Sequence, residues 1–260
     1  MRRPSISGIQ RRDLLVALSY LVAALPANAG LVEVIAIAKR SVGAVGTFSA
    51  VDNPRFTFRG SGFVVGDGNH LVTNAHVLPE PTAGDGKSAL VLQFNTEIGR
   101  LEARPALVVR LDVEHDLALL HFDGGPLPAL GIADAKDTHE GQSVAFIGYP
   151  IAGVLGFKPV THRGIISSIT AVALPPPNSQ LLNDKTVRRL RQGSFDIYQL
   201  DAVAYPGNSG GPVLDIETGN VVGVINMVLV RATKESALSQ PTGITYAIPA
   251  NFIDALIRGK

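Results

Sequence analysis

The stretch Tyr205-Pro206-Gly207-Asn208-Ser209-Gly210-Gly211-Pro212 decides how the rest of this sequence is interpreted. A serine between glycines lies in a tight turn with few side chains around it, so its hydroxyl is accessible and neighbouring backbone N–H groups can point at one spot. A nucleophilic serine is presented to a carbonyl group in this way. Clusters of Gly, Asn, Ser and Pro are also common in ordinary loops, so the partners of Ser209 elsewhere in the chain must decide.

The positions of the histidines exclude one alternative, the α/β-hydrolase fold. Gly207-x-Ser209-x-Gly211 matches the nucleophile elbow of that fold, which needs its histidine downstream of the serine. All six histidines precede Ser209, and the Gly-Gly-Pro after it disfavours the helix into which an elbow leads. The opposite order, histidine, acid, serine, is that of chymotrypsin-like proteases. Two upstream stretches supply it, Leu71-Val-Thr-Asn-Ala-His76-Val77 and Glu114-His115-Asp116-Leu-Ala-Leu-Leu120.

Six motifs, in register from about residue 31 to the end, resemble the HtrA/Deg branch of the trypsin-like serine proteases. They are Gly60-Ser-Gly-Phe63, Thr73-Asn-Ala-His76-Val77, Asp116-Leu-Ala-Leu-Leu120, Asp201-Ala202, Gly207-Asn-Ser-Gly-Gly-Pro212 and Gly243-Ile-Thr-Tyr-Ala-Ile-Pro249. The resemblance implies an all-β, chymotrypsin-like double six-stranded β-barrel with short N-terminal and C-terminal helices. It also implies a serine endopeptidase with the catalytic triad His76, Asp116 and Ser209 and an oxyanion hole of backbone groups of Gly207, Asn208 and Ser209.

The resemblance further locates a substrate-binding pocket. Its expected residues are Val203, Tyr205, Asn226, Met227, Val228 and Gly243. Val203 is apolar where specificity for Lys or Arg needs an acid, so a basic substrate side chain would be buried without a partner. We therefore expect cleavage after Val, Ile, Leu or Ala, without strict selectivity, while the substrate backbone adds as a strand beside 226–228.

Composition excludes several other classes of function. The chain has 260 residues, 46% of them hydrophobic and 17% charged, with 27 Gly, which indicates a folded, loop-rich, β-dominated protein rather than a disordered one. Outside residues 1–29 the net charge is −2, which gives no basic balance for nucleic acid. The absence of cysteine excludes a cysteine protease and a thiolate metal site, and no His-Glu-x-x-His motif occurs. We expect no metal and no organic cofactor.

Residues 1–29 have the pattern of a bacterial signal peptide. Four arginines precede the apolar run 14–25, and Pro26-Ala27-Asn28-Ala29 supplies small residues for cleavage after Ala29. The run is short for a membrane span, which takes about 20 residues, so an uncleaved anchor is the disfavoured alternative. Gln10-Arg11-Arg12 also resembles a twin-arginine signal, and the choice between the two export routes stays open. We expect an exported, periplasmic or secreted protein without stable membrane insertion after signal removal.

The pattern of apolar residues divides the protease domain, 30–260. A short helix is predicted from Leu31 to Ala38, an N-terminal barrel from about 41 to 123, a linker at 124–141 and a C-terminal barrel at 142–249. The chain then forms a helix at 251–258, with Asn251 as N-cap and Phe252, Ile253, Leu256 and Ile257 on one apolar face. Only two residues follow this helix, so no PDZ domain is expected. Successive residues of a strand point to opposite faces, so His115 and His121, an odd number of positions from Asp116, should face away from it.

Some alternatives stay open. The stretch 174–193 contains Pro175-Pro176-Pro177 and then Lys185, Arg188, Arg189 and Arg191, and it could be a solvated charge run or receive an acidic activator or substrate. The same triad would also serve an esterase, and the fold without activity would serve as a binding or chaperone module. The expected partners are polypeptide substrates, and the resemblance to HtrA proteases allows a homo-oligomer such as a trimer.

Overall fold

The computed structural model describes residues 30–79, 88–96, 99–150, 156–172, 195–227 and 243–259. Within these ranges the chain forms strands and short helices in a regular order. The strands are β1 (Val42–Ser49), β2 (Phe56–Val65), β3 (His70–Asn74), β4 (Ser88–Asn95), β5 (Leu101–Asp112), β6 (Leu117–Phe122), β7 (Ser143–Gly148), β8 (Val160–Val172), β9 (Phe195–Asp201), β10 (Pro212–Asp215), β11 (Val221–Asn226) and β12 (Ile244–Pro249). The α-helices are α1 (Leu31–Ala38) and α5 (Ala250–Arg258), and the 3-10 helices are η1 (Lys39–Ser41), η2 (Ala75–Val77) and η3 (Ala135–Asp137).

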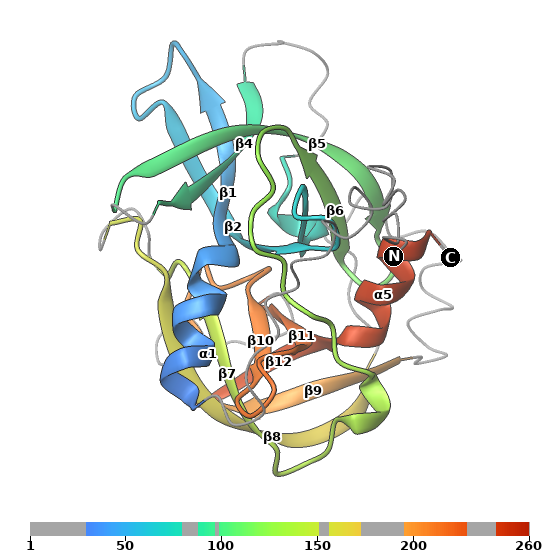
Figure 1. Ribbon diagram of the computed structural model, residues 1–260. Coiled ribbons are helices and arrows are strands. Elements are labelled where there is room, and N and C mark those ends of the chain that lie inside the picture. The colour runs from blue at the N-terminus through green and yellow to red at the C-terminus, as the bar shows by residue number, and fades with distance from the viewer. Residues whose placement is uncertain are drawn as a thin grey trace, which may run out of the picture.

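The strands close into two antiparallel six-stranded barrels, which Figure 1 shows one above the other. The first barrel has the strand order β1-β2-β3-β6-β5-β4, and the second has the order β10-β11-β12-β9-β8-β7. Closure leaves no edge strand in either barrel, so each strand is hydrogen-bonded to a neighbour on both sides. The predicted double-barrel fold is confirmed, and the segment between Phe122 and Ser143 connects the two barrels.

Three apolar clusters hold this arrangement together, and β6 contributes to two of them. Leu120 and Phe122 pack inside the first barrel, whereas Leu117 and Leu119 belong to a cluster that also contains Leu214 of the second barrel. The third cluster fills the inside of the second barrel. Because β6 is buried on both faces from Leu117 to Leu120, its sequence there is an apolar run rather than an alternating pattern.

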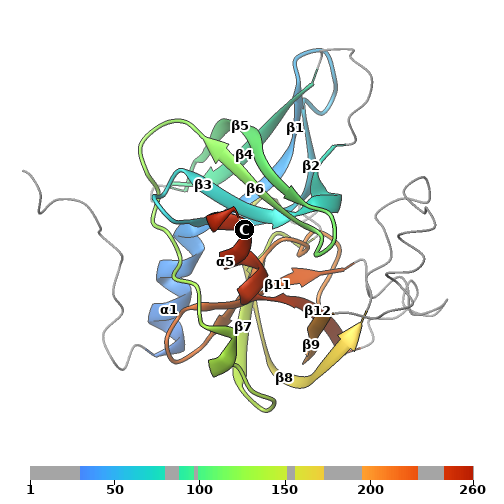
Figure 2. The ribbon, with the colours of Figure 1, turned by 90° about the vertical axis from the view of Figure 1, so that its right-hand side faces the viewer.

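The two α-helices cover the barrels at opposite sides of the view in Figure 1, and Figure 2 shows α5 at the junction between them. The helix predicted from Leu31 to Ala38 is confirmed as α1, and its Val34 and Ala38 are buried. In α5 the buried residues include Ile253 and Leu256, again as predicted. The predicted N-cap is wrong: α5 begins at Ala250, its N-cap is Pro249, and Asn251 is already inside the helix.

No helix in the described ranges is both long and apolar enough to cross a membrane. The predicted signal peptide, the whole basic stretch 174–193 and Val228 of the expected pocket lie outside the described residues.

Candidate active site

His76 lies in η2, directly after β3, where the first barrel faces the second. Its Nδ1 is 2.6 Å from Asp116 Oδ2, and its backbone N–H donates to Asp116 Oδ1 over 2.9 Å. A carboxylate only accepts hydrogen bonds, so this pair fixes the ring with the proton on Nδ1 and leaves Nε2 as the acceptor. The structure thus joins the predicted histidine to the predicted acid.

Asp116 occupies the end of the turn between β5 and β6 in a left-handed conformation, with φ of 53°. Asn74 Nδ2 and Ala75 N both donate to its backbone carbonyl over 3.0 Å and stabilise that conformation. Its carboxylate is buried, and Asn226 Nδ2 donates to Oδ2 over 2.8 Å. A buried carboxylate is costly unless hydrogen-bonded, and here both oxygens accept bonds, from residues of both barrels.

Ser209 follows a turn that has the features of type II. Asn208 N–H donates to the carbonyl of Tyr205 over 3.0 Å, Pro206 occupies the first central position, and Gly207 occupies the second with φ of 101°. This second position needs a positive φ, which glycine adopts without strain. Gly210 is also left-handed, with φ of 84°, and a Cβ there would overlap the carbonyl oxygen of Ser61. The glycines of the motif therefore meet a backbone requirement of this loop.

The three residues predicted for the oxyanion hole differ in whether their backbone N–H groups already donate a hydrogen bond. The N–H of Asn208 is used inside the turn, so its amide is not available as a donor, and that part of the prediction is wrong. In the part of the chain that the structure describes, the N–H groups of Gly207 and Ser209 have no hydrogen-bond acceptor. The Ser209 hydroxyl oxygen accepts a bond from Met227 N–H over 3.3 Å. Two amides next to the serine are thus available to bind an anionic oxygen.

The residues predicted for the substrate pocket separate into two groups. Val203 and Tyr205 are half-buried in the segment that leads to Ser209, and Met227 packs against the core of the second barrel. Gly243 is exposed and its carbonyl accepts from Ala202 N–H over 2.9 Å, which ties it to the same segment. The side chain of Asn226 is buried and bonds to Asp116, whereas the predicted pairing of a substrate strand beside 226–228 concerns its backbone and stays a prediction.

The remaining histidines near the predicted motifs have partners of their own. His115 Nδ1 is 2.6 Å from Asp112 Oδ2, and its ring stacks on Phe252 of α5 with centroids 3.9 Å apart. His121 Nε2 is 3.4 Å from Asp123 Oδ1. Neither ring bonds to Asp116, in agreement with the parity argument.

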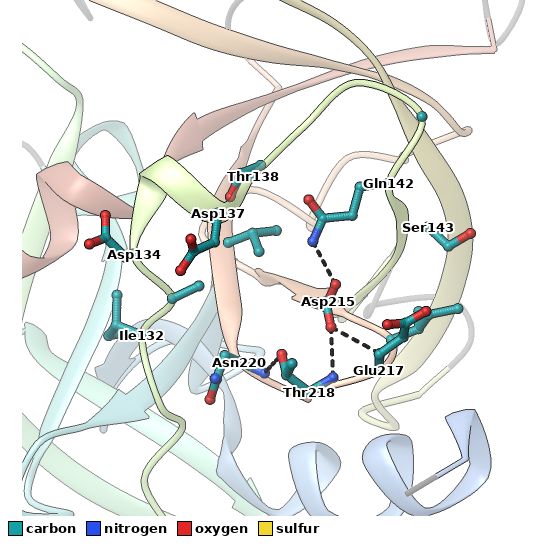
Figure 3. Close-up of a pocket in the computed structure, with 14 residues that line it drawn as sticks. Ile132, Asp134, Asp137, Thr138, Gln142, Ser143, Asp215, Glu217, Thr218 and Asn220 are labelled. Atoms are coloured by element: carbon teal, nitrogen blue, oxygen red, sulfur yellow. Dashed lines mark hydrogen bonds between the residues drawn. The ribbon is translucent and has the colours of Figure 1, made fainter. Parts of the chain in front are cut away.

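A cavity whose lining contains none of the three triad residues has a different chemistry. The cavity has a volume of about 610 Å³. It is lined in part by Asp134, Asp137, Asp215 and Glu217, which Figure 3 labels. Burial raises the pKa of Asp215, but hydrogen bonds from Gln142 and Thr218 outweigh burial and hold that pKa below its ordinary value. No histidine lines the cavity, and no group of three or more described His, Asp and Glu side chains could hold a metal ion.

Comparison with known protein families gives one match for most of the folded part of the chain. The family described as "Trypsin-like peptidase domain" matches residues 60–224, a range that contains His76, Asp116 and Ser209.

Two curated proteins with similar sequences are named as proteases. The chain is 30% identical over 194 residues to a probable periplasmic serine endoprotease DegP-like of Halomonas elongata, covering 73% of this chain and 32% of that protein. It is 30% identical over 230 residues to Protease Do-like 5, chloroplastic, of Arabidopsis thaliana, covering 87% of this chain and 63% of that protein. The chain thus spans about a third of the first of these relatives and under two thirds of the second.

Solved structures agree with the fold. The crystal structure of Deg5 has a TM-score of 0.60 at 26% identity, covering 87% of this chain and 90% of that one. The HtrA-type protease AlgW with a tripeptide has a TM-score of 0.61 at 25% identity, covering 89% and 63%.

Proposed function

The chain belongs to the trypsin-like peptidase family, and from this membership we propose that it is a serine endopeptidase of the HtrA/Deg type. The observation that carries the proposal is the 2.6 Å contact between His76 Nδ1 and Asp116 Oδ2, in a molecule whose facing loop presents Ser209 beside two amides without partners among the described residues. The two groups lie on different barrels, so the reaction takes place at the junction between them.

The proposed reaction is acyl transfer in two steps. Ser209 Oγ attacks the carbonyl carbon of the substrate, and His76 Nε2 accepts the serine proton and then donates it to the leaving amine. Asp116 keeps the imidazole in the required tautomer and stabilises the imidazolium that forms. Water then hydrolyses the acyl-enzyme by the same route in reverse, so no metal or organic cofactor is required.

The oxyanion of each tetrahedral intermediate would bind to the amides of Gly207 and Ser209. Each such donor typically lowers the barrier by roughly 3 kcal/mol, because it is already oriented where negative charge develops. The turn that orients Gly207 is fixed by the bond from Asn208 to Tyr205.

For the substrate we propose exported polypeptides in unfolded form. Support comes from the signal-like residues 1–29 and from the DegP-like relatives, whose names include "periplasmic". The half-buried, apolar Val203 supports cleavage after aliphatic residues, since a basic side chain beside it would lack a carboxylate partner.

The test compares the chain with its Ser209→Ala variant on an unfolded protein such as casein, with the cut sites mapped by mass spectrometry. We expect cleavage mainly after Val, Ile, Leu and Ala, together with labelling by a fluorophosphonate, and neither in the variant. Equal behaviour of the two proteins would refute the catalytic assignment. Hydrolysis of esters without any cleavage of casein would favour the esterase, and cuts mainly after Lys or Arg would refute the pocket.

A further inference from the structure

Ser61 lies in the motif Gly60-Ser-Gly-Phe63, to which the reaction described above gives no role. It is on β2 of the first barrel, and its residue is completely buried. A Cβ on Gly60 would lie 3.0 Å from the carbonyl oxygen of Ser209, and a Cβ on Gly210 would overlap the carbonyl oxygen of Ser61. The glycines thus allow β2 and the serine loop to approach backbone to backbone, with Ser61 at the contact.

The hydroxyl of Ser61 makes two hydrogen bonds, and their directions are determined. Tyr149 N–H can only donate, and it does so to Ser61 Oγ over 2.9 Å. The hydroxyl proton is therefore free to go to the carbonyl oxygen of Gly207, which is 2.6 Å away. The backbone of Ser61 is also engaged, because its N–H donates to Ser209 O over 2.8 Å and its carbonyl accepts from Thr73 Oγ1 over 2.7 Å.

These bonds fix the peptide group between Gly207 and Asn208 at both ends. Its carbonyl is held by Ser61 Oγ, and its N–H is held by the carbonyl of Tyr205. The next two carbonyls of the loop are held as well, that of Asn208 by Gly211 N–H and that of Ser209 by Ser61 N–H. Rotation of the loop backbone would break several of these bonds together, so the free amides of Gly207 and Ser209 keep one orientation.

We propose that Ser61 is a positioning residue of the reaction, whose hydroxyl holds the Gly207 carbonyl and thereby keeps the two amides of the oxyanion hole aligned. The inference rests on the proposed function and assigns the serine of the Gly60-Ser-Gly-Phe63 motif a part in it. The hydroxyl of Ser61 bonds to Gly207 and Tyr149 rather than to Ser209 Oγ or His76, so Ser61 acts on the reaction only through the loop.

The matched control is Ser49, a second buried serine on a strand of the same barrel. Its residue is 4% exposed, and its Oγ has no hydrogen-bond partner among the described residues. Ser61→Ala and Ser49→Ala therefore remove the same atoms from similarly buried sites, and only the first change removes the bond to Gly207. Ser61→Thr keeps a hydroxyl and serves as the conservative variant.

The experiment measures kcat and KM for a peptide substrate, and the rate of fluorophosphonate labelling, in the full chain and these variants. Removal of one oxyanion donor costs roughly 10²–10³ in kcat, so a donor that is only released from alignment should cost less. We expect Ser61→Ala to lower kcat and the labelling rate about 10- to 100-fold with KM within about threefold, Ser49→Ala to stay within about twofold, and Ser61→Thr to recover most of the loss.

Three outcomes would overturn the proposal. They are equal kcat values in Ser61→Ala and Ser49→Ala, a loss in Ser61→Ala that the folded fraction measured by circular dichroism fully explains, and a loss confined to KM. If Ser61→Thr does not fold, the comparison of the two alanine variants still decides. Failure of the proposed function itself is recognised separately, because the unmodified chain would then cleave no more substrate than Ser209→Ala.

Discussion

Asp116 combines a left-handed backbone with a buried carboxylate, and Asn226 is one of the groups that make this possible. Its amide donates to the same oxygen, Oδ2, that faces His76 Nδ1. The asparagine belongs to β11 of the second barrel, whereas the aspartate belongs to the first. This side-chain bond thus links the histidine–acid pair to the barrel that presents the serine.

We predict that Asn226→Ala lowers kcat by roughly 10-fold or more. A hydrogen bond to a charged group contributes about 1.5–3 kcal/mol, and its loss lets the carboxylate rotate away from the imidazole. Steady-state kinetics on a peptide substrate provide the measurement, and the exposed Asn251→Ala is the control. Wild-type kcat in Asn226→Ala would show that the amide does not help to position Asp116.

The sequence predicted His76, Asp116 and Ser209 because each lies in a local motif with a fixed relation to a strand end. Such local motifs could not predict that Asn226 is a hydrogen-bond partner of Asp116. Asn226 is 110 positions away, and its side chain meets the carboxylate only because of the way β11 packs against the turn before β6. The amide of Asn208 was misassigned for a related reason, since a type II turn uses the N–H of its fourth residue internally.

At the scale of elements, the turn between β5 and β6 is docked on α5 through aromatic rings. His115 is bonded to Asp112 and stacks on Phe252, and Phe195 at the start of β9 packs against both rings, with centroids 4.7 Å from His115 and 5.2 Å from Phe252. Arg110 of β5 also donates to the carbonyls of Leu256 and Ile257 at the end of α5. The helix therefore supports the turn that ends in Asp116.

We predict that Phe252→Ala lowers the free energy of unfolding by about 2 kcal/mol. Truncation of a fully buried phenylalanine costs about 3–5 kcal/mol, and Phe252 is only partly buried. For a domain of this size the change corresponds to a fall in Tm of about 4–8 °C. Thermal unfolding followed by circular dichroism is the measurement. The control is Phe48→Ala, because Phe48 is 40% exposed. Equal falls in both variants would contradict the packing role of Phe252.

Element boundaries were predictable where the apolar pattern decides them and not where neighbouring strands do. The buried face of α5 follows from the spacing of its apolar residues, and it was predicted correctly. The start of the helix depends instead on β12, which stays paired through Pro249 opposite Gly223. The chain then turns directly into the helix at Ala250, so Asn251 comes too late to act as N-cap.

At the scale of the whole molecule, two kinds of titratable group make the fold less stable in acid. Burial raises the pKa of Asp112, but hydrogen bonds with His115 outweigh burial and lower the pKa overall, as hydrogen bonds also do for Asp215. A carboxyl group whose pKa is lowered by folding stabilises the fold above its unfolded value of 3.8, and this contribution is lost as the pH falls through the folded pKa. The stabilisation by these carboxylates is therefore lost only at strongly acidic pH.

His162 lowers the stability of the fold at milder pH than the carboxylates do. Its pKa is shifted by burial rather than by hydrogen bonds. It lies on β8, stacked on Phe146 with ring centroids 4.7 Å apart, and burial lowers its pKa from the ordinary value of 6.5. The unfolded chain therefore binds a proton first as the pH falls below about 6.5, whereas the folded chain keeps the ring neutral. Stability is unaffected by His162 above that pH and declines between 6.5 and the lower pKa of the folded state.

We predict that His162→Phe reduces the difference in Tm between pH 7.5 and pH 5.0, because phenylalanine keeps the stacked ring and cannot bind a proton. The measurement is thermal unfolding at both pH values for the unmodified chain, for His162→Phe and for His139→Gln, which changes an exposed histidine. Only His162→Phe should reduce the difference, and comparison at each pH with the unmodified chain cancels the contributions of the other histidines and of the carboxylates. An unchanged difference in His162→Phe would mean that His162 takes up its proton in the folded molecule as readily as in the unfolded chain. In that case the burial of its ring would not be what limits stability in mild acid.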